Sequence, residues 1–178
     1  QTFNTAVGYD AGNAVTTGVQ NTLIGALAGD ALTTGVQNVA VGYNALSTED
    51  GHGANVAVGM NALSTQNAGA DAYNTAVGHA AGAAVTTGTN NTLIGGLAGD
   101  AITTASQNTA VGYNALTATT TGAANTAVGF EALDANTTAP NNTGIGWRAL
   151  YANTTGHSNV SVGVSALTTN TTGSANVT

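Results

Sequence analysis

The chain has 178 residues, enough for one domain with a buried core, but only one residue is Lys or Arg and the net charge is −7. Phosphate backbones and anionic membranes are bound through Lys and Arg, so we expect no nucleic-acid partner and no membrane insertion. The sequence also contains no cysteine and no apolar run long enough to span a bilayer.

A five-residue motif, Asn-(Thr/Val)-x-(Val/Ile)-Gly, recurs along the whole chain. Successive motifs start 17 residues apart, except that Asn74 follows Asn55 by 19 residues. This period predicts a single repeat domain over residues 1–178, made of ten 17-residue coils with a two-residue insertion near residues 64–73. Both ends of the chain fall inside a repeat, so we expect it to be a segment of a longer fibre.

Within each unit, counted from the Asn as position one, residue types follow a fixed order. β-branched residues at alternate positions predict a short strand, and the glycine at position five predicts a corner leading into a second short strand. A polar tract, usually Thr-Thr-Gly, then predicts a loop. The corner glycines are Gly8, Gly25, Gly42, Gly59, Gly78, Gly95, Gly112, Gly129, Gly146 and Gly163.

The predicted fold is therefore all-β: a parallel β-solenoid, or β-roll, in which equivalent positions stack roughly 4.8 Å apart. Stacked like charges would repel, whereas stacked amides can form a ladder of hydrogen bonds. We expect such a ladder at position one, formed by Asn4, Asn21, Asn38, Asn55, Asn74, Asn91, Asn108, Asn125, Asn142 and Asn159.

Positions three and four are both largely apolar, as at Ala110 and Val111. Consecutive strand residues point to opposite faces, so both faces of the strand are expected to be buried. One coil has only one interior, and identical faces of neighbouring chains around an axis would cover the second. A lone solenoid with one exposed face is the alternative.

The segments NTAVGYNAL, NVAVGMNAL and NTAVGFEAL resemble the head repeats of YadA-type trimeric autotransporter adhesins. The NTAVG variant with ALYANTTG at residues 149–156 is also similar to repeats of bacteriophage tail fibres and bacterial surface fibres. This resemblance implies a left-handed β-roll and a homotrimer of chains lying side by side. It also implies an extracellular location on a cell surface or virion. The adhesin-head unit is shorter, and the Thr-Thr-Gly loop could account for the extra length.

Position six carries a column of aromatic residues: Tyr9, Tyr43, Tyr113, Phe130 and Trp147. These rings either pack over the corner glycine of the adjacent coil or form a surface for a host receptor or glycan. His52, His79 and His157 have no partner at a regular metal-ligand spacing, and His79 lies in the aromatic column. We therefore predict no metal site, no cofactor and no catalytic residues, so the chain is not expected to be an enzyme.

The resulting functional hypothesis is a structural or adhesive segment of an extracellular fibre. The alternative is an ice-binding β-solenoid that uses stacked Thr columns. Its Thr residues, however, are mostly adjacent, as in Thr33-Thr34 and Thr120-Thr121, and adjacent strand residues face opposite ways.

The 17-residue register makes one prediction for the only arginine. Glu131 and Arg148 both occupy position seven, in consecutive coils. We expect their Cα atoms to lie about 5 Å apart and their side chains to form a surface ion pair, worth at most about 1 kcal/mol. A Cα separation beyond about 7 Å would show that the coil length or the strand assignment is wrong.

Overall fold

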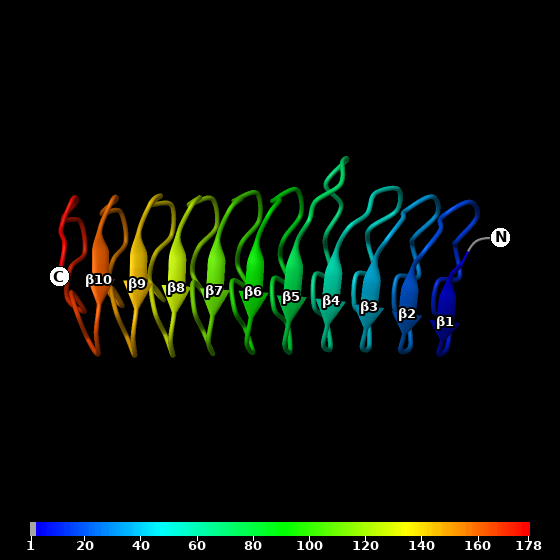
Figure 1. The fold of residues 1–178 in the computed structure, drawn as a ribbon, viewed down its shortest axis with the longest axis horizontal. Coiled ribbons are helices and arrows are strands. Elements are labelled where there is room, and N and C mark those ends of the chain that lie inside the picture. Colours follow the sequence, from blue (N-terminus) through cyan, green and yellow to red (C-terminus); the bar gives the residue numbers. More distant parts are fainter. Residues whose placement is uncertain (1–2) are drawn as a thin grey trace.

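A computed structural model describes residues 3–178, which form a parallel β-solenoid (Figure 1). Each coil contributes one three-residue strand, and the ten strands form one sheet in sequence order. No helix occurs in this part of the chain, so the predicted all-β parallel solenoid is confirmed. The strands are β1 (Thr5–Val7), β2 (Thr22–Ile24), β3 (Val39–Val41), β4 (Val56–Val58), β5 (Thr75–Val77), β6 (Thr92–Ile94), β7 (Thr109–Val111), β8 (Thr126–Val128), β9 (Thr143–Ile145) and β10 (Val160–Val162).

The register of the sheet follows the sequence repeat. Thr109 of β7 pairs with Thr126 of β8, the equivalent residue one unit later. The insertion does not shift this register, because Val56 of β4 still pairs with Thr75 of β5. The two extra residues are accommodated in the loop between β4 and β5, which projects beyond the other loops in Figure 1.

The expected second strand of each coil is absent. After the corner, positions seven and nine adopt left-handed backbone angles, as at Asn114 (φ 57°) and Leu116 (φ 56°), so the chain turns instead of extending. Hydrogen bonds still connect this side of neighbouring coils: the Leu116 N–H donates to the Ala132 carbonyl oxygen at 3.1 Å. Asn at position seven and Gly at position nine favour this left-handed turn in some coils, but Leu, Glu and Arg at the same positions in other coils do not, so the column as a whole gave no consistent signal.

Left-handed angles also occur at position seventeen, as at Gln107 (φ 64°). For residues other than glycine this conformation costs roughly 1–2 kcal/mol. It persists where the surrounding structure over-determines it, and here every coil is stacked between similar coils. The backbone path is thus imposed by the neighbouring coils more than by local propensity.

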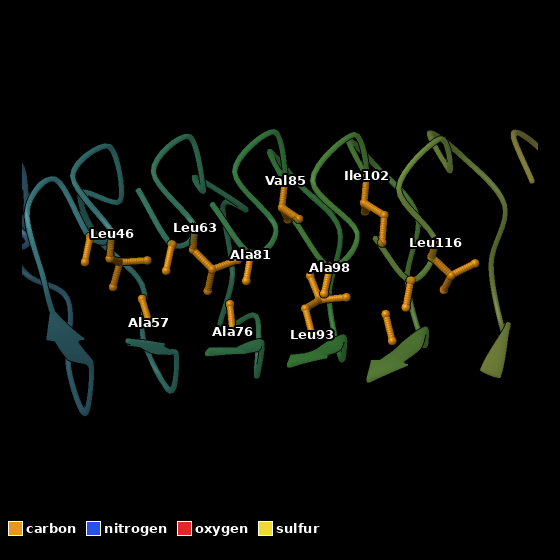
Figure 2. Close-up of a cluster of buried hydrophobic side chains, with 14 of the residues drawn as sticks. Leu46, Ala57, Leu63, Ala76, Ala81, Val85, Leu93, Ala98, Ile102 and Leu116 are labelled. Atoms are coloured by element: carbon orange, nitrogen blue, oxygen red, sulfur yellow. The ribbon is translucent and has the colours of Figure 1, made fainter. Parts of the chain in front are cut away.

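The core is a continuous row of Ala, Leu, Val and Ile side chains along the axis, between the sheet and the turns (Figure 2). Position nine decides how it is filled. Where this residue is Leu, as at Leu116, its side chain is buried and position twelve is the polar Thr119. Where it is Gly99, an added Cβ would lie 2.8 Å from side-chain atoms of both Leu93 and Ile102, which occupy the same space. The two core types have complementary volumes, as close packing requires.

The single chain buries only one face of the strand, as expected for a coil with one interior. Position three is buried inside the coil, as at Ala110, whereas positions two and four point outward. Val111 is half-buried, and the exposed fraction reaches 58% at Val7 and 57% at Val162. The side chains of positions two and four on β1–β10 are called the outer face below.

The corner glycines are required by the spacing of the coils. Gly112 has φ 139°, and a Cβ on it would lie only 2.4 Å from the carbonyl oxygen of Gly129 in the next coil. Gly163 has almost the same angle, φ 140°, but its added Cβ would meet only the Ala166 Cβ, at 3.8 Å. An alanine at Gly163 would therefore cause backbone strain alone, whereas an alanine at Gly112 would cause the same strain and a steric clash.

We expect Gly163→Ala to lower the free energy of unfolding by about 1–3 kcal/mol, through backbone strain alone. Gly112→Ala should lower it by a further 1–3 kcal/mol or so, because the new methyl group overpacks the coil junction. Urea unfolding followed by circular dichroism measures both. Equal losses in the two variants would show that the coils can move apart at little cost.

Candidate functional site

The asparagines of position one form the predicted ladder. Side chain-to-backbone bonds occur at every junction, and amide-to-amide bonds occur at several of them, as from the Asn125 Nδ2 to the Asn108 Oδ1 at 3.2 Å. In every coil the side-chain Oδ1 accepts the main-chain N–H of the next asparagine, as from Asn125 to Asn108 at 2.9 Å. The Nδ2 donates to the loop carbonyl fourteen residues later, as from Asn108 to Gly122 at 3.0 Å. Asn108 thus ties the start of one strand to the end of its own loop and to the next coil, from a buried position.

One rung of the ladder is incomplete. Asn55 still accepts the N–H of Asn74, at 3.1 Å, but its Nδ2 has no hydrogen-bond partner. Asn55 begins the coil that carries the two-residue insertion, so the loop carbonyl found in other coils is out of place. The buried Gln66 in the same coil also has an unpartnered amide nitrogen, Nε2.

The outer face is uncharged from β1 to β10. Position four is always Val or Ile, and position two is Thr except at Val39, Val56 and Val160. All eight Asp and Glu residues and Arg148 lie at other positions. A continuous, partly exposed strip of apolar side chains of this length is typical of an interaction surface.

The aromatic column follows the corner and is exposed. The exposed fraction runs from 41% at Phe130 to 75% at Tyr9, with Tyr43 and Trp147 between them. Tyr113 and Phe130, in consecutive coils, stack with ring centroids 5.8 Å apart and planes 17° apart. The rings are thus available to a ligand, and the Tyr113 and Phe130 rings also stack on each other.

Arg148 forms the predicted pair with Glu131, with Nε 2.6 Å from Oε2, which confirms the pairing that the register predicted. Its guanidinium carbon also lies 4.8 Å from the Trp147 ring centroid and 4.9 Å from that of Tyr151, within cation–π range. The pKa of the nearby Asp134 is raised, mainly by burial and secondly by the Glu131 carboxylate, whereas Arg148 lowers it. The only guanidinium of the chain is therefore already engaged.

Threonines of the loop form a second ladder, at position thirteen. The Thr103 hydroxyl donates to the Thr120 carbonyl oxygen at 3.2 Å, and Thr154 donates likewise to Thr171 at 3.0 Å.

Asn136 and Asn153 stack at position twelve through a 3.1 Å amide hydrogen bond and are fully buried. Although both start Asn-x-Thr sequences, they are inaccessible to glycosylation in the folded chain.

The structure also brings together a cluster that the sequence pattern did not indicate. One donor atom each of Glu49, Asp50 and His52 lie within 4.8 Å of one another. Their spacing is not a regular metal-binding pattern, and only the burial of Glu49 reveals that its side chain turns inward. The detectable signal was that Asp50, Gly51 and His52 replace the Thr-Thr-Gly of the preceding coil, directly after Glu49. His79 and His157 lie outside the cluster and are exposed.

Residues 3–178 enclose no pocket, and they include no helix long and apolar enough to cross a membrane. Comparisons with protein-family models, with curated proteins and with solved structures gave no match to this chain.

Replacing Asn108 with Ala tests the ladder. The change leaves the buried Asn125 N–H and the Gly122 carbonyl oxygen without partners, at about 1–3 kcal/mol each. We expect the free energy of unfolding to fall by about 2–6 kcal/mol in denaturant titrations. Asn67→Ala, at an exposed loop residue, is the control and should change it by less than about 0.5 kcal/mol. Similar losses in both variants would contradict a structural role for the ladder.

Proposed function

We propose that this chain is a non-catalytic structural and adhesive segment of an extracellular fibre, and that the fibre is a homotrimer. The observation that carries the proposal is the outer face: ten strands long, uncharged and partly exposed. Water contact with so many Val and Ile side chains is unfavourable by roughly 25 cal/mol per Å² of apolar surface. Covering this face would therefore stabilise the fold along its whole length.

The occupant that fits this face best is a further copy of the same chain. The face repeats once per coil, so a partner must present matching side chains at the same spacing over ten strands. A second copy has that spacing by construction. Although each chain carries a net charge of −7, no charged side chain lies at positions two or four, so two outer faces can meet without like charges in contact.

The similarity of the repeats to YadA-type adhesin heads and to tail and surface fibres supports three copies in a left-handed arrangement, on a cell surface or virion. The exposed aromatic column supports the adhesive part of the proposal. Stacked rings such as Tyr113 and Phe130 offer flat apolar surfaces to sugar rings or to a host receptor. The negative charge supports the absence of a nucleic-acid partner.

The oligomeric mass tests the assembly. In light scattering coupled to size-exclusion chromatography, we expect three times the 17.1 kDa mass of one chain. Val111→Asp places three carboxylates in the buried interface, so this variant should be monomeric while keeping its β circular dichroism. Thr121→Asp, on an exposed loop residue of the same coil, should remain trimeric. A monomeric native protein, or a Val111→Asp variant of unchanged mass, would contradict the proposal.

Ice binding is the second candidate, favoured by the Thr residues at position two of the regular sheet. The position-thirteen hydroxyls are less suitable, because they already donate to main-chain carbonyls of the next coil. A thermal-hysteresis measurement separates the two functions. Thermal hysteresis that is present in the native protein and lost in Thr109→Tyr would favour ice binding. No thermal hysteresis in the native protein would rule out ice binding and favour the fibre function.

A further inference from the structure

The loop that connects β3 with β4 contains a buried acid with no Lys or Arg partner. Glu49 occupies position twelve, which is Leu32 in the preceding coil and Gln66 in the following one. Its side chain is fully buried. The only arginine of the chain pairs with Glu131, far along the axis, and there is no lysine. A carboxylate buried without a cation is unfavourable unless another group compensates it.

The hydrogen bonds around Glu49 leave two buried polar atoms without partners. Its Oε1 accepts the main-chain N–H of His52 at 3.0 Å, but its Oε2 has no partner. The His52 Nδ1 lies 3.6 Å from Oε1, is itself buried, and has no hydrogen-bond partner either. The Asp50 carboxylate completes the group from the solvent side, where its side chain is exposed.

We propose that Glu49, Asp50 and His52 bind a divalent transition-metal ion of the Zn²⁺ class. Zn²⁺ accepts imidazole nitrogen and carboxylate oxygen at about 2.0–2.2 Å, whereas Ca²⁺ and Mg²⁺ are bound almost entirely through oxygen. In a tetrahedral site with bonds of about 2.1 Å, neighbouring donor atoms lie about 3.4 Å apart. The 3.6 Å between the Glu49 and His52 donors is close to this separation.

The location gives such an ion a structural role that is independent of the fibre proposal. The His52 carbonyl oxygen accepts the Nδ2 of Asn38, and the Asp50 carbonyl oxygen accepts the Thr33 N–H at 2.6 Å. The next coil carries the two-residue insertion and the incomplete rung at Asn55. A metal ion would therefore fasten the loop immediately before the irregular coil, where the regular ladder is interrupted.

The first experiment is calorimetric titration of the whole chain with ZnCl₂, with Co²⁺ absorption spectra as a second readout of the ligand set. We expect one ion per chain, and at least about tenfold weaker binding in His52→Ala and Asp50→Asn. Both changes lie on partly or fully exposed side chains, so folding should be retained. His79→Ala and His157→Ala are matched controls that should bind as the native chain does. No binding by the native chain, or undiminished binding in His52→Ala and Asp50→Asn, would overturn the proposal.

Glu49→Gln tests whether the Glu49 carboxylate binds the metal ion or only fills its place in the core. Glutamine resembles Gln66 in the same column and removes the uncompensated buried charge. We expect this variant to melt at a higher temperature than the native chain in EDTA, and to gain no further stability when Zn²⁺ is added. The native chain should gain stability with Zn²⁺. Equal Zn²⁺-dependent gains in both proteins would also overturn the proposal.

Discussion

The fold depends on one interaction repeated at every junction: a buried asparagine whose side chain takes the place of a backbone acceptor for the next coil. Its Oδ1 receives the N–H that begins the following strand, and its Nδ2 closes the loop of its own coil, as Asn108 does for Asn125 and Gly122. Both functions need an amide, because a carboxylate lacks the donor and an apolar side chain lacks both groups. The glycine corner depends on the same close approach of the coils, because a Cβ on Gly112 would lie 2.4 Å from the Gly129 carbonyl oxygen.

Much of this architecture could be predicted from the sequence because it is strictly periodic. The asparagine and glycine columns recur at one interval, and the pairing of Arg148 with Glu131 followed directly from that interval. The turn after the corner could not be predicted, because residues such as Leu116 and Arg148 take left-handed angles that their own propensities disfavour. Stacking between neighbouring coils imposes these angles, and stacking is a tertiary effect.

The candidate metal cluster could not be predicted for a related reason. Whether the side chain of position twelve points inward depends on the coil geometry. The residue there is apolar in some coils, as at Leu32, and polar in others, as at Asn136, so the sequence does not show whether this position is buried. The outer face is an intermediate case. Its apolar composition was evident in the sequence, and so was the limit of one buried face per coil. The structure adds that position four is on the partly exposed face, as at Val111.

The loop between β4 and β5 shows how this kind of molecule can change in length. Two added residues are tolerated there because they project away from the sheet, and Val56 still pairs with Thr75. A single-residue insertion within a strand would instead move the side chains that follow it in that strand to the opposite face. Growth along the axis is therefore limited to whole coils, each adding about 4.8 Å. A lineage of such proteins can vary its reach in uniform steps by gene duplication, while surface loops diversify without altering that reach.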